Sequence, residues 1–457
     1  MLTTPDITVR MGQKENGAQE QGLRRELSAR QMAMVAVGGS IGTGLLLGSG
    51  YAISIAGPAV IISYVITALM CWTVAMAMGE MSSVHPAAGS FGVYAELYLN
   101  PWAGFVARSG YWISVVIAIG AELIAAGTYM RLWFPKVPEV TWMIVFSVLL
   151  LAINLFPVKS YGSFEYWFAF IKVLTILLFI VIGASLLFSG RVPRQYVSDG
   201  GFFPNGGGAA LLVASFGLYS FLGIEMVAVS SGEASSAKAV SKATRMAFAI
   251  LAFLYVGAMA VLVGVMPWRH AGDGQSPFVT VFNVAGIPAA GFIMNLVVLS
   301  AALSGANATL YVASRMLFSL ARSGYAPAKV GVLNAHGVPM RALLISMIGI
   351  VAAIVVQLNA SEKAFLYIIN TSLVGGMLAW LISLAAHIRF RKAISPEQLA
   401  ALPLRSPLGT AGSWIGFVAV TAAVIATAWV PRSRVAVLCV GPYLVVLTVL
   451  YFIMRKR

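Results

Sequence analysis

Long apolar runs, separated by short polar stretches, follow one another along almost the whole chain. The hydrocarbon core of a membrane is about 30 Å thick, so a helix that crosses it needs about 20 apolar residues. The pattern therefore predicts an all-α polytopic protein with twelve transmembrane helices. These helices are expected at residues 31–55, 58–83, 102–132, 140–157, 164–189, 209–231, 246–268, 289–320, 341–358, 364–387, 412–430 and 435–454.

The composition excludes an ordinary globular enzyme. Of the 457 residues, 60% are hydrophobic and only 10% are Asp, Glu, Lys or Arg, whereas a soluble domain carries about 25% charged residues. Cys71 and Cys439 both lie in apolar runs, and the four histidines share no metal-binding spacing. We therefore expect no disulfide framework, no metal site and no cofactor.

The basic residues predict the orientation of the chain. Thirty Lys and Arg against fifteen Asp and Glu give a net charge of +15. Twenty of the thirty fall in the terminal segments and in the loops on the same side of the predicted helices, and eight fall in the loops on the other side. By the positive-inside rule the richer side is cytoplasmic. Residues 1–30 and 455–457 are then cytoplasmic tails, and the basic surplus calls for no nucleic-acid partner.

The first predicted helix is rich in glycine. Residues 38–48 read GGSIGTGLLLG, and each glycine weakens a helix by roughly 0.8 to 1 kcal/mol relative to alanine. This run favours a local unwinding, and unwound backbone at mid-depth must line a cavity or bind a polar group. The alternative is that the glycines only allow close helix packing.

The sixth predicted helix has a second candidate interruption. In SFGLYSFLGIEMV, residues 215–227, Gly217 and Gly223 flank a short uncharged stretch. Gly42 and Gly223 each lie near the middle of the first predicted helix of a five-helix block, residues 31–189 and residues 209–387. Paired interruptions of this kind are typical of secondary transporters with inverted repeats. We therefore expect two repeats, 31–189 and 209–387, followed by two further helices in 412–454.

The ends of interrupted helices predict what such a site binds. A restarting helix presents free N–H groups, which suit a carboxylate, and here these lie near Gly42, Thr43 and Gly44. A stopping helix presents free carbonyls, which suit an ammonium, and these lie near Ser40, Tyr219 and Leu222. A ligand with both groups on one carbon satisfies both interruptions, so an α-amino acid is the expected substrate.

At these residues the sequence resembles the amino acid–polyamine–organocation superfamily, and within it the bacterial amino acid permeases for proline, γ-aminobutyrate and aromatic amino acids. The resemblance runs from LRRELSARQMAMVAVGGSIGTGLLLGSG through GEM, AAGSF, EYWFAFIKV and FLGIEMVAVSSGEA to LSAALSGANATLYVASRMLFSLARSGYAP. It implies twelve helices, a five-plus-five inverted-repeat (LeuT-like) core, and uptake driven by the proton gradient across the inner membrane.

Carried over by position, the resemblance implies roles for particular residues. Thr43 and Gly44 would contact the substrate carboxylate, with Gly42 closing the turn, and the carbonyls of Ser40, Tyr219 and Leu222 would bind the amine. Tyr219 stands where related transporters often place an aromatic gate. Weaker candidates for lining the pocket are Ser220, Phe221, Ser304, Asn307 and Thr309.

Three ionisable residues within the predicted helices are candidates for proton coupling: Lys172, Glu225 and Glu122. A charge in lipid is costly, so each should face the interior of the bundle. Lys172 resembles a lysine of the fifth helix that, in proton-coupled relatives, stands where sodium-coupled relatives bind a cation. A static salt bridge, or an ammonium that reaches the membrane surface, would equally explain it.

The leading hypothesis is an amino acid importer coupled to protons, with the lipid bilayer as its surroundings. An exchanger or a polyamine or cationic amino acid carrier is the alternative. A monomer would suffice for this activity, and the sequence leaves the oligomeric state open. An intramembrane enzyme is not expected, because the predicted helices contain no catalytic dyad.

Overall fold

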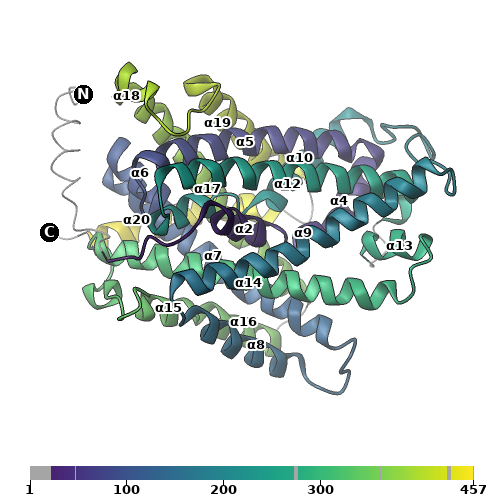
Figure 1. Cartoon of the computed structure of the whole chain (residues 1–457), viewed down its shortest axis with the longest axis horizontal. Coiled ribbons are helices and arrows are strands. Elements are labelled where there is room, and N and C mark those ends of the chain that lie inside the picture. Colours follow the sequence, from purple (N-terminus) through teal and green to yellow (C-terminus); the bar gives the residue numbers. More distant parts are fainter. Residues whose placement is uncertain (1–21, 47, 272–275, 360–361, 430–433, 456–457) are drawn as a thin grey trace.

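The structure is a computed structural model that describes residues 22–46, 48–271, 276–359, 362–429 and 434–455. In this part the chain forms helices and one isolated β-bridge, between Leu27 and Ala234, and no strand. The long helices run side by side along the longest axis of the molecule (Figure 1). Residues 1–21, 456 and 457 of the expected tails lie outside the described residues, as do residues 47 and 430 of the expected helices.

Every predicted span overlaps helical structure over most of its described residues. The first two spans correspond to α2 (Ala29–Ser40), α3 (Thr43–Leu46), α4 (Gly48–Ala56) and α5 (Val60–Val84). The next four correspond to α7 (Pro101–Met130), α8 (Glu139–Asn154), α9 (Val158–Phe188), α10 (Gly206–Phe221) and α11 (Met226–Ser230). The last six correspond to α12 (Ala237–Val265), α14 (Ala290–Arg322), α15 (Met340–Ser346), α16 (Ile348–Asn359), α17 (Glu362–Ala393), α19 (Gly409–Ala426) and α20 (Arg434–Met454).

Ten segments of the described chain are long and apolar enough to cross a membrane, and α8 is a shorter apolar helix. The chain is therefore a multi-pass membrane protein. Short helices join the spans: α6 (Ser90–Tyr98) and α18 (Pro396–Ala400) lie at one end of the bundle, and α13 (Pro277–Val284) lies at the other (Figure 1).

Two helices begin earlier than the apolar pattern predicted. The α9 helix begins at Val158, directly after Pro157, and α12 begins at Ala237, where the Ser236 side chain accepts a hydrogen bond from the Ala239 amide. Both extensions carry polar residues, which hydropathy does not assign to a membrane-spanning helix. A proline or a capping serine can still mark the start of a helix there. The first turns of α9 and α12 therefore extend beyond the apolar runs.

Helices α10 and α14 lie in the interior of the bundle. In the most apolar window of α14, 83% of the residues are buried, compared with 11% in the described part of α20. Helix α5 holds α10 by polar contacts, because Ser63 and Thr67 donate hydrogen bonds to the carbonyls of Ala210 and Ala214, at 2.7 and 2.8 Å. The second interruption therefore lies in the interior of the bundle, at the end of α10, and α14 packs against the helix that follows it.

Several connections meet at the end of the bundle where the described chain begins. Arg24 donates a hydrogen bond to the carbonyl of Ala335, and Gln31 donates one to the carbonyl of Lys159. Leu27 bridges to Ala234. The structure thus gathers at one end the segments for which the charge pattern predicted a common side.

Candidate functional site

The first helical span is interrupted after Ser40. Helix α2 ends there, Ile41 adopts φ −79° and ψ 88°, and a helix starts again at Thr43. The amide of Gly42 donates to the carbonyl of Ser40 at 3.0 Å, which closes a tight turn. The backbone therefore leaves the helix within GGSIGTG, where the sequence predicted an unwinding.

The second interruption lies after Phe221. Leu222 adopts φ −57° and ψ 133°, which ends α10, and Gly223 follows with φ +114°. This left-handed region strongly favours glycine, because a Cβ would clash with the backbone. Helix α11 then begins at Met226. The sixth predicted span thus consists of two helical pieces.

The two interruptions are in direct contact. A Cβ added to Gly223 would lie 2.5 Å from Ser40 Oγ and 2.8 Å from the carbonyl carbon of Gly39. A Cβ added to Gly39 would lie 2.3 Å from the Sδ of Met226. Side chains cannot occupy such distances without movement, so glycine at both positions is what lets the interruptions meet.

Not every glycine in these motifs belongs to an interruption. Gly38 and Gly39 lie within α2, and Gly217 lies within α10. A Cβ on Gly217 would lie 2.5 Å from Oγ1 of Thr67 in α5. These glycines serve close helix packing, which was the alternative role expected for glycines in these motifs, while Gly42 and Gly223 lie in the turns.

The chain borders open space at Gly44. Gly44 is exposed although Gly42 and Leu45 beside it are buried, and an added Cβ at Gly44 would meet no atom within 4 Å. On the second interrupted helix, Tyr219 and Leu222 are half-buried. Candidates from both interruptions thus keep accessible surface within a largely buried region.

The backbone groups at the first interruption are partly occupied. The carbonyl of Ser40 accepts hydrogen bonds from the Gly42 amide at 3.0 Å and from the Tyr255 hydroxyl at 2.8 Å. Because a carbonyl oxygen has two lone pairs, it has no strong acceptor site left in this conformation. Gly44 lies in the first turn of α3, whose amides lack acceptors within the helix. The side chain of Thr43 lies outside the described residues.

Four other pocket candidates, Ser220, Phe221, Thr309 and Tyr219, contact other parts of the bundle. The Ser220 hydroxyl lies 3.2 Å from the Tyr64 hydroxyl in α5, and the Phe221 ring packs edge-on against Tyr255 in α12, with centroids 4.8 Å apart. Thr309 donates to a carbonyl of its own helix. The Tyr219 hydroxyl is a hydrogen-bond partner of Thr427, beyond the end of α19. The contacts given for these four side chains lead to α5, to α12, to the helix of Thr309 itself and to Thr427.

Lys172 reaches the first interruption from α9. Its side chain is fully buried, and the ammonium donates hydrogen bonds to the carbonyls of Gly38 and Ile41, at 2.5 and 2.9 Å. Both carbonyls belong to the end of α2, where helix carbonyls lack acceptor partners in the helix. The ammonium is buried, and among the described residues no carboxylate lies within 4.0 Å of it. It therefore acts as a cap on the interrupted helix.

Glu165, two turns before Lys172 on the same helix, was not predicted. Its carboxylate is fully buried and accepts hydrogen bonds from Ser304 Oγ at 2.5 Å and Asn307 Nδ2 at 2.7 Å. A Cβ on Gly38 would lie 2.2 Å from its Oε1. Glu165 and Lys172 are seven residues apart and so lie on one helix face, which was the signal in the sequence for Glu165. Because the predicted span began at residue 164, Glu165 was placed at the end of the span rather than within it.

Glu122 of α7 lies beside the start of α3. A Cβ on Gly42 would lie 3.0 Å from Glu122 Oε1, and a Cβ on Gly305 in α14 would lie 3.4 Å from Glu122 Cδ. The side chain is half-buried. A carboxylate thus stands next to the helix start that was predicted to bind the carboxylate of a substrate.

Glu225 is the hub of the second interruption. Its carboxylate accepts hydrogen bonds from the Gly223 amide at 3.0 Å, from the Tyr111 hydroxyl at 2.7 Å and from the Trp380 indole N–H at 3.1 Å. These donors come from the turn itself, from α7 and from α17. The side chain therefore fixes the non-helical turn against two long helices.

A second group of buried charges lies between the residues that follow α11, helix α14 and the segment around Leu27. Glu233 and Arg315 form a double ion pair, at 2.9 and 3.2 Å, and the Arg315 guanidinium lies 4.0 Å from the ring centre of Tyr311. The Leu27 amide donates to the Glu233 carbonyl, and the Ser235 amide donates to the Leu27 carbonyl. Glu233 lies in the motif SSGEA and Arg315 lies in the motif ASRMLF. These motifs were the signal in the sequence for the two residues.

Glu80 of GEM is the third buried carboxylate that was not predicted, after Glu165 and Glu233. It pairs with Arg391 of α17 at 2.5 Å, accepts a hydrogen bond from the Ser406 amide, and lies 3.5 Å from His387. This network joins α5 to the loop before α19. Over the described residues, no three His, Cys, Asp or Glu side chains are grouped so that they could hold a metal ion.

Comparison with known proteins identifies the family. The family "Amino acid permease" matches residues 31–457. The chain is 36% identical over 443 residues to the "Uncharacterized amino acid permease YtnA" of Bacillus subtilis (strain 168), covering 95% of this chain and 96% of the relative. It is 35% identical over 445 residues to the gamma-aminobutyric acid permease of the same organism, covering 96% and 95%.

The aromatic amino acid transport protein AroP of Escherichia coli (strain K12) is 34% identical over 440 residues, covering 95% of this chain and 96% of the relative. The alignments thus include both interruptions and all the buried charges described above. The chain therefore belongs to the amino acid permease family, and it is a membrane transport protein rather than an enzyme.

Proposed function

We propose that this protein is a secondary active transporter that imports an amino acid across the inner membrane by proton symport with alternating access. The observation that carries the proposal is the direct contact of two interrupted helices, where Gly223 packs on Gly39 and Ser40. Interrupted helices expose backbone polar groups within the membrane, and such groups are retained where they line a binding cavity.

The architecture proposed for this function has twelve transmembrane helices. Residues 31–189 and 209–387 form two inverted repeats, as in the LeuT-like fold, and residues 412–454 add two helices. Both tails are cytoplasmic, because twenty basic residues fall on their side and eight fall on the other. The equivalent positions of the two interruptions support the repeat.

The substrate proposed is an α-amino acid zwitterion. Its carboxylate would meet the first-turn amides of α3 at Gly44, where the backbone borders open space. Its ammonium would meet the carbonyls of the last turn of α10 at Tyr219 and Leu222. The Ser40 carbonyl contributes less to binding the substrate ammonium than the sequence implied, because it already accepts two hydrogen bonds. Relatives named for γ-aminobutyric acid and aromatic amino acids support an amino acid as the class of substrate.

Lys172 is the first coupling residue proposed. As an ammonium it donates to Gly38 and Ile41 and holds the first interruption in its observed form. Without its proton, Lys172 loses its charge and one donor, so the hold on the carbonyls weakens. Gain and loss of this proton would therefore bias the interrupted helix between two arrangements.

Glu122 is the second coupling residue proposed. Its Oε1 lies beside Gly42, at the helix start that the substrate carboxylate would approach. Two carboxylates at one helix end repel each other, so a proton on Glu122 would favour substrate binding. Substrate and proton would then enter together. Glu225 is retained as a third candidate, although its hydrogen bonds to three donors also give it a structural role.

Alternating access requires closures that can open. We propose that the Glu233–Arg315 ion pair and the Leu27–Glu233 backbone contact close the cytoplasmic end in this conformation. Buried ion pairs lose little free energy when both charges become hydrated together. Such a pair can therefore serve as a latch between two states.

A test of this proposal is a binding panel followed by counterflow. The purified protein is heated with each protein amino acid and with γ-aminobutyrate, and a ligand that binds raises the midpoint of unfolding. The best ligand is then loaded into vesicles that contain the protein, and exchange with labelled ligand is measured. We expect stabilisation and exchange for at least one amino acid. Exchange of polyamines alone would instead favour a polyamine carrier.

A further inference from the structure

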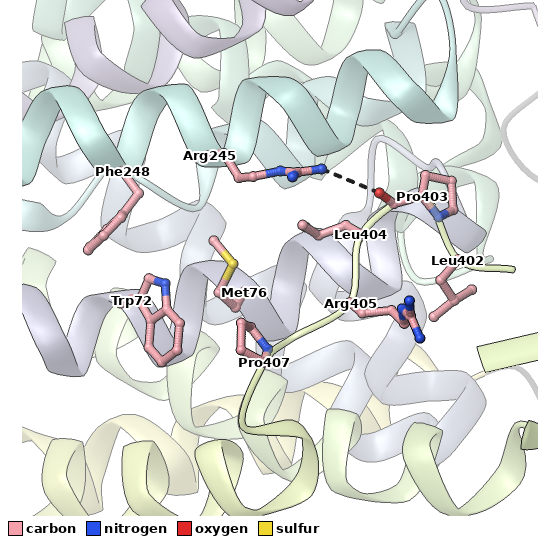
Figure 2. Close-up of a pocket in the computed structure, with 9 residues that line it drawn as sticks. All are labelled: Trp72, Met76, Arg245, Phe248, Leu402, Pro403, Leu404, Arg405 and Pro407. Carbon is pink, nitrogen blue, oxygen red and sulfur yellow. Dashed lines mark hydrogen bonds between the residues drawn. The ribbon is translucent and has the colours of Figure 1, made fainter. Parts of the chain in front are cut away.

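A pocket separate from the interruptions lies on the side of the bundle. It is formed between α5, α12 and the loop that precedes α19, and its volume is about 390 Å³. Figure 2 shows nine lining residues, which include two arginines and no acidic residue. None of the interruptions or buried ion pairs described above contributes a residue to this pocket.

The pocket has a basic end and an apolar end. Arg245 extends toward the loop, where its guanidinium lies 3.5 Å from the carbonyl of Pro403, and Arg405 lies on the same loop (Figure 2). Trp72, Met76 and Phe248 come from α5 and α12 and lie away from Arg405, with Pro407 of the loop beside Met76 (Figure 2). Charged and apolar surfaces are thus arranged as in the binding site of an amphiphile.

More basic residues lead to the same place. Lys238, Lys242 and Arg245 are spaced by four and three residues on α12, so they share one helix face. All three are exposed, as is Arg405. The pocket therefore lies at the end of a basic stripe, which attracts anionic lipid headgroups near a membrane surface.

The apolar end continues onto the outer face of the bundle. On α5, Leu69 is 60% exposed and Val65 is 40% exposed. They precede Trp72 by three and seven residues and so share its helix face. An apolar chain that leaves the pocket past Trp72 thus meets a continuous apolar surface that already faces lipid.

We propose that this pocket, between Arg245 and Arg405 at one end and Trp72 at the other, binds an anionic phospholipid. The phosphate would lie between the two guanidinium groups, which form bidentate contacts with phosphate oxygens. The first part of an acyl chain would lie against Trp72, Met76 and Phe248. A zwitterionic phospholipid would add a positive headgroup charge to two arginines that no acid in the pocket offsets.

The test is lipid binding by the full-length protein in detergent, measured by native mass spectrometry. The probes are phosphatidylglycerol and phosphatidylcholine with the same acyl chains. We expect phosphatidylglycerol to bind more tightly to the wild type. Arg405→Ala should weaken its binding about fivefold, and Arg245→Ala with Arg405→Ala about 25-fold, from the usual contribution of each basic residue near an anionic surface. Phosphatidylcholine binding should change little.

Arg191→Ala with Arg194→Ala is the matched control, because it removes two exposed arginines from the loop after α9. This control should bind phosphatidylglycerol as the wild type does. Arg405 lies on an exposed loop and forms no hydrogen bond within the described part of the chain, so Arg405→Ala carries the test if the double variant unfolds early.

Three results would overturn the proposal. The first is equal affinity for the two lipids, and the second is unchanged phosphatidylglycerol binding by Arg405→Ala. The third is displacement of the lipid by millimolar inorganic phosphate, which would indicate a site for a free anion. Counterflow in phosphatidylcholine vesicles should be the same for the variants and the wild type.

Discussion

The ammonium of Lys172 in α9 lies 2.5 Å from the carbonyl oxygen of Gly38 in α2, and these residues are 134 positions apart in the chain. Gly38 is followed by the turn that interrupts the first span, so this hydrogen bond joins a titratable group to the backbone of the proposed binding site. Under the proposed function, this hydrogen bond would connect proton binding at Lys172 to the shape of the site.

Replacing Lys172 by alanine should separate exchange from accumulation. The variant loses the group whose protonation is proposed to bias the interruption, so it should exchange amino acid in counterflow but fail to accumulate it under an inward proton gradient. Loss of donors to the two carbonyls should also lower the free energy of unfolding, by about 1–3 kcal/mol for each carbonyl left unsatisfied. Thermal unfolding and vesicle uptake measure the two effects.

Lys159→Ala is the control for this variant, because Lys159 is exposed and lies in the first turn of the same helix. It should keep both exchange and accumulation. Accumulation at the wild-type rate by Lys172→Ala would remove Lys172 from the coupling mechanism.

Glu122→Gln should make substrate binding independent of pH. In the wild type, a lower pH should tighten binding, because a protonated Glu122 no longer repels the substrate carboxylate beside Gly42. Glutamine imitates the protonated form, so its affinity should stay near the low-pH value as the pH rises. Titrations of the purified protein at several pH values measure this dependence, and Glu397→Gln, at an exposed position, should follow the wild type. The same pH dependence in Glu122→Gln and the wild type would contradict the role of Glu122.

Gly223→Ala should abolish binding and transport. Its φ of +114° is strained for alanine, at a cost of about 1–3 kcal/mol, and the new Cβ would lie 2.7 Å from the backbone nitrogen of Ser40. The two interruptions could then no longer meet. Counterflow and ligand-induced stabilisation are the measurements. Gly208→Ala, in the first turn of α10 with open space around it, should behave as the wild type. Activity in Gly223→Ala near that of this control would argue against the contact.

Removing one charge of the Glu233–Arg315 pair should lower the stability of the protein strongly, and removing both charges should lower it less. Arg315→Met leaves a buried carboxylate, which typically costs about 3–5 kcal/mol in stability. Adding Glu233→Gln should recover part of this loss, because no unpaired charge then remains. Unfolding midpoints of the two single variants and the double variant give the interaction free energy between Glu233 and Arg315. Additive losses would show that the residues do not act as a pair.

Much of the fold follows from hydropathy alone. Runs of about 20 apolar residues have one stable form in a membrane, the helix, because every backbone polar group must be satisfied within the segment. The ends of the helices were less predictable. The first turns of α9 and α12 carry Lys159 and Lys238, and those helices begin after Pro157 and after the capping residue Ser236 rather than where the apolar runs start.

The interruptions were predictable in position but not in detail. A high glycine content indicates either an unwound turn or close packing, and the local sequence of Gly217 does not reveal that Thr67 of α5 lies against it. Likewise, the Tyr255 hydroxyl that occupies the Ser40 carbonyl comes from 215 positions away. Contacts between distant segments depend on tertiary packing, which a single sequence does not display.

The most direct measurement is uptake of the best ligand by vesicles that contain the purified protein, with the outside made acidic and the inside held neutral. The account predicts that the internal concentration rises above the external one and falls back when a protonophore is added. Internal and external concentrations that become equal with and without the pH difference would contradict proton-driven import.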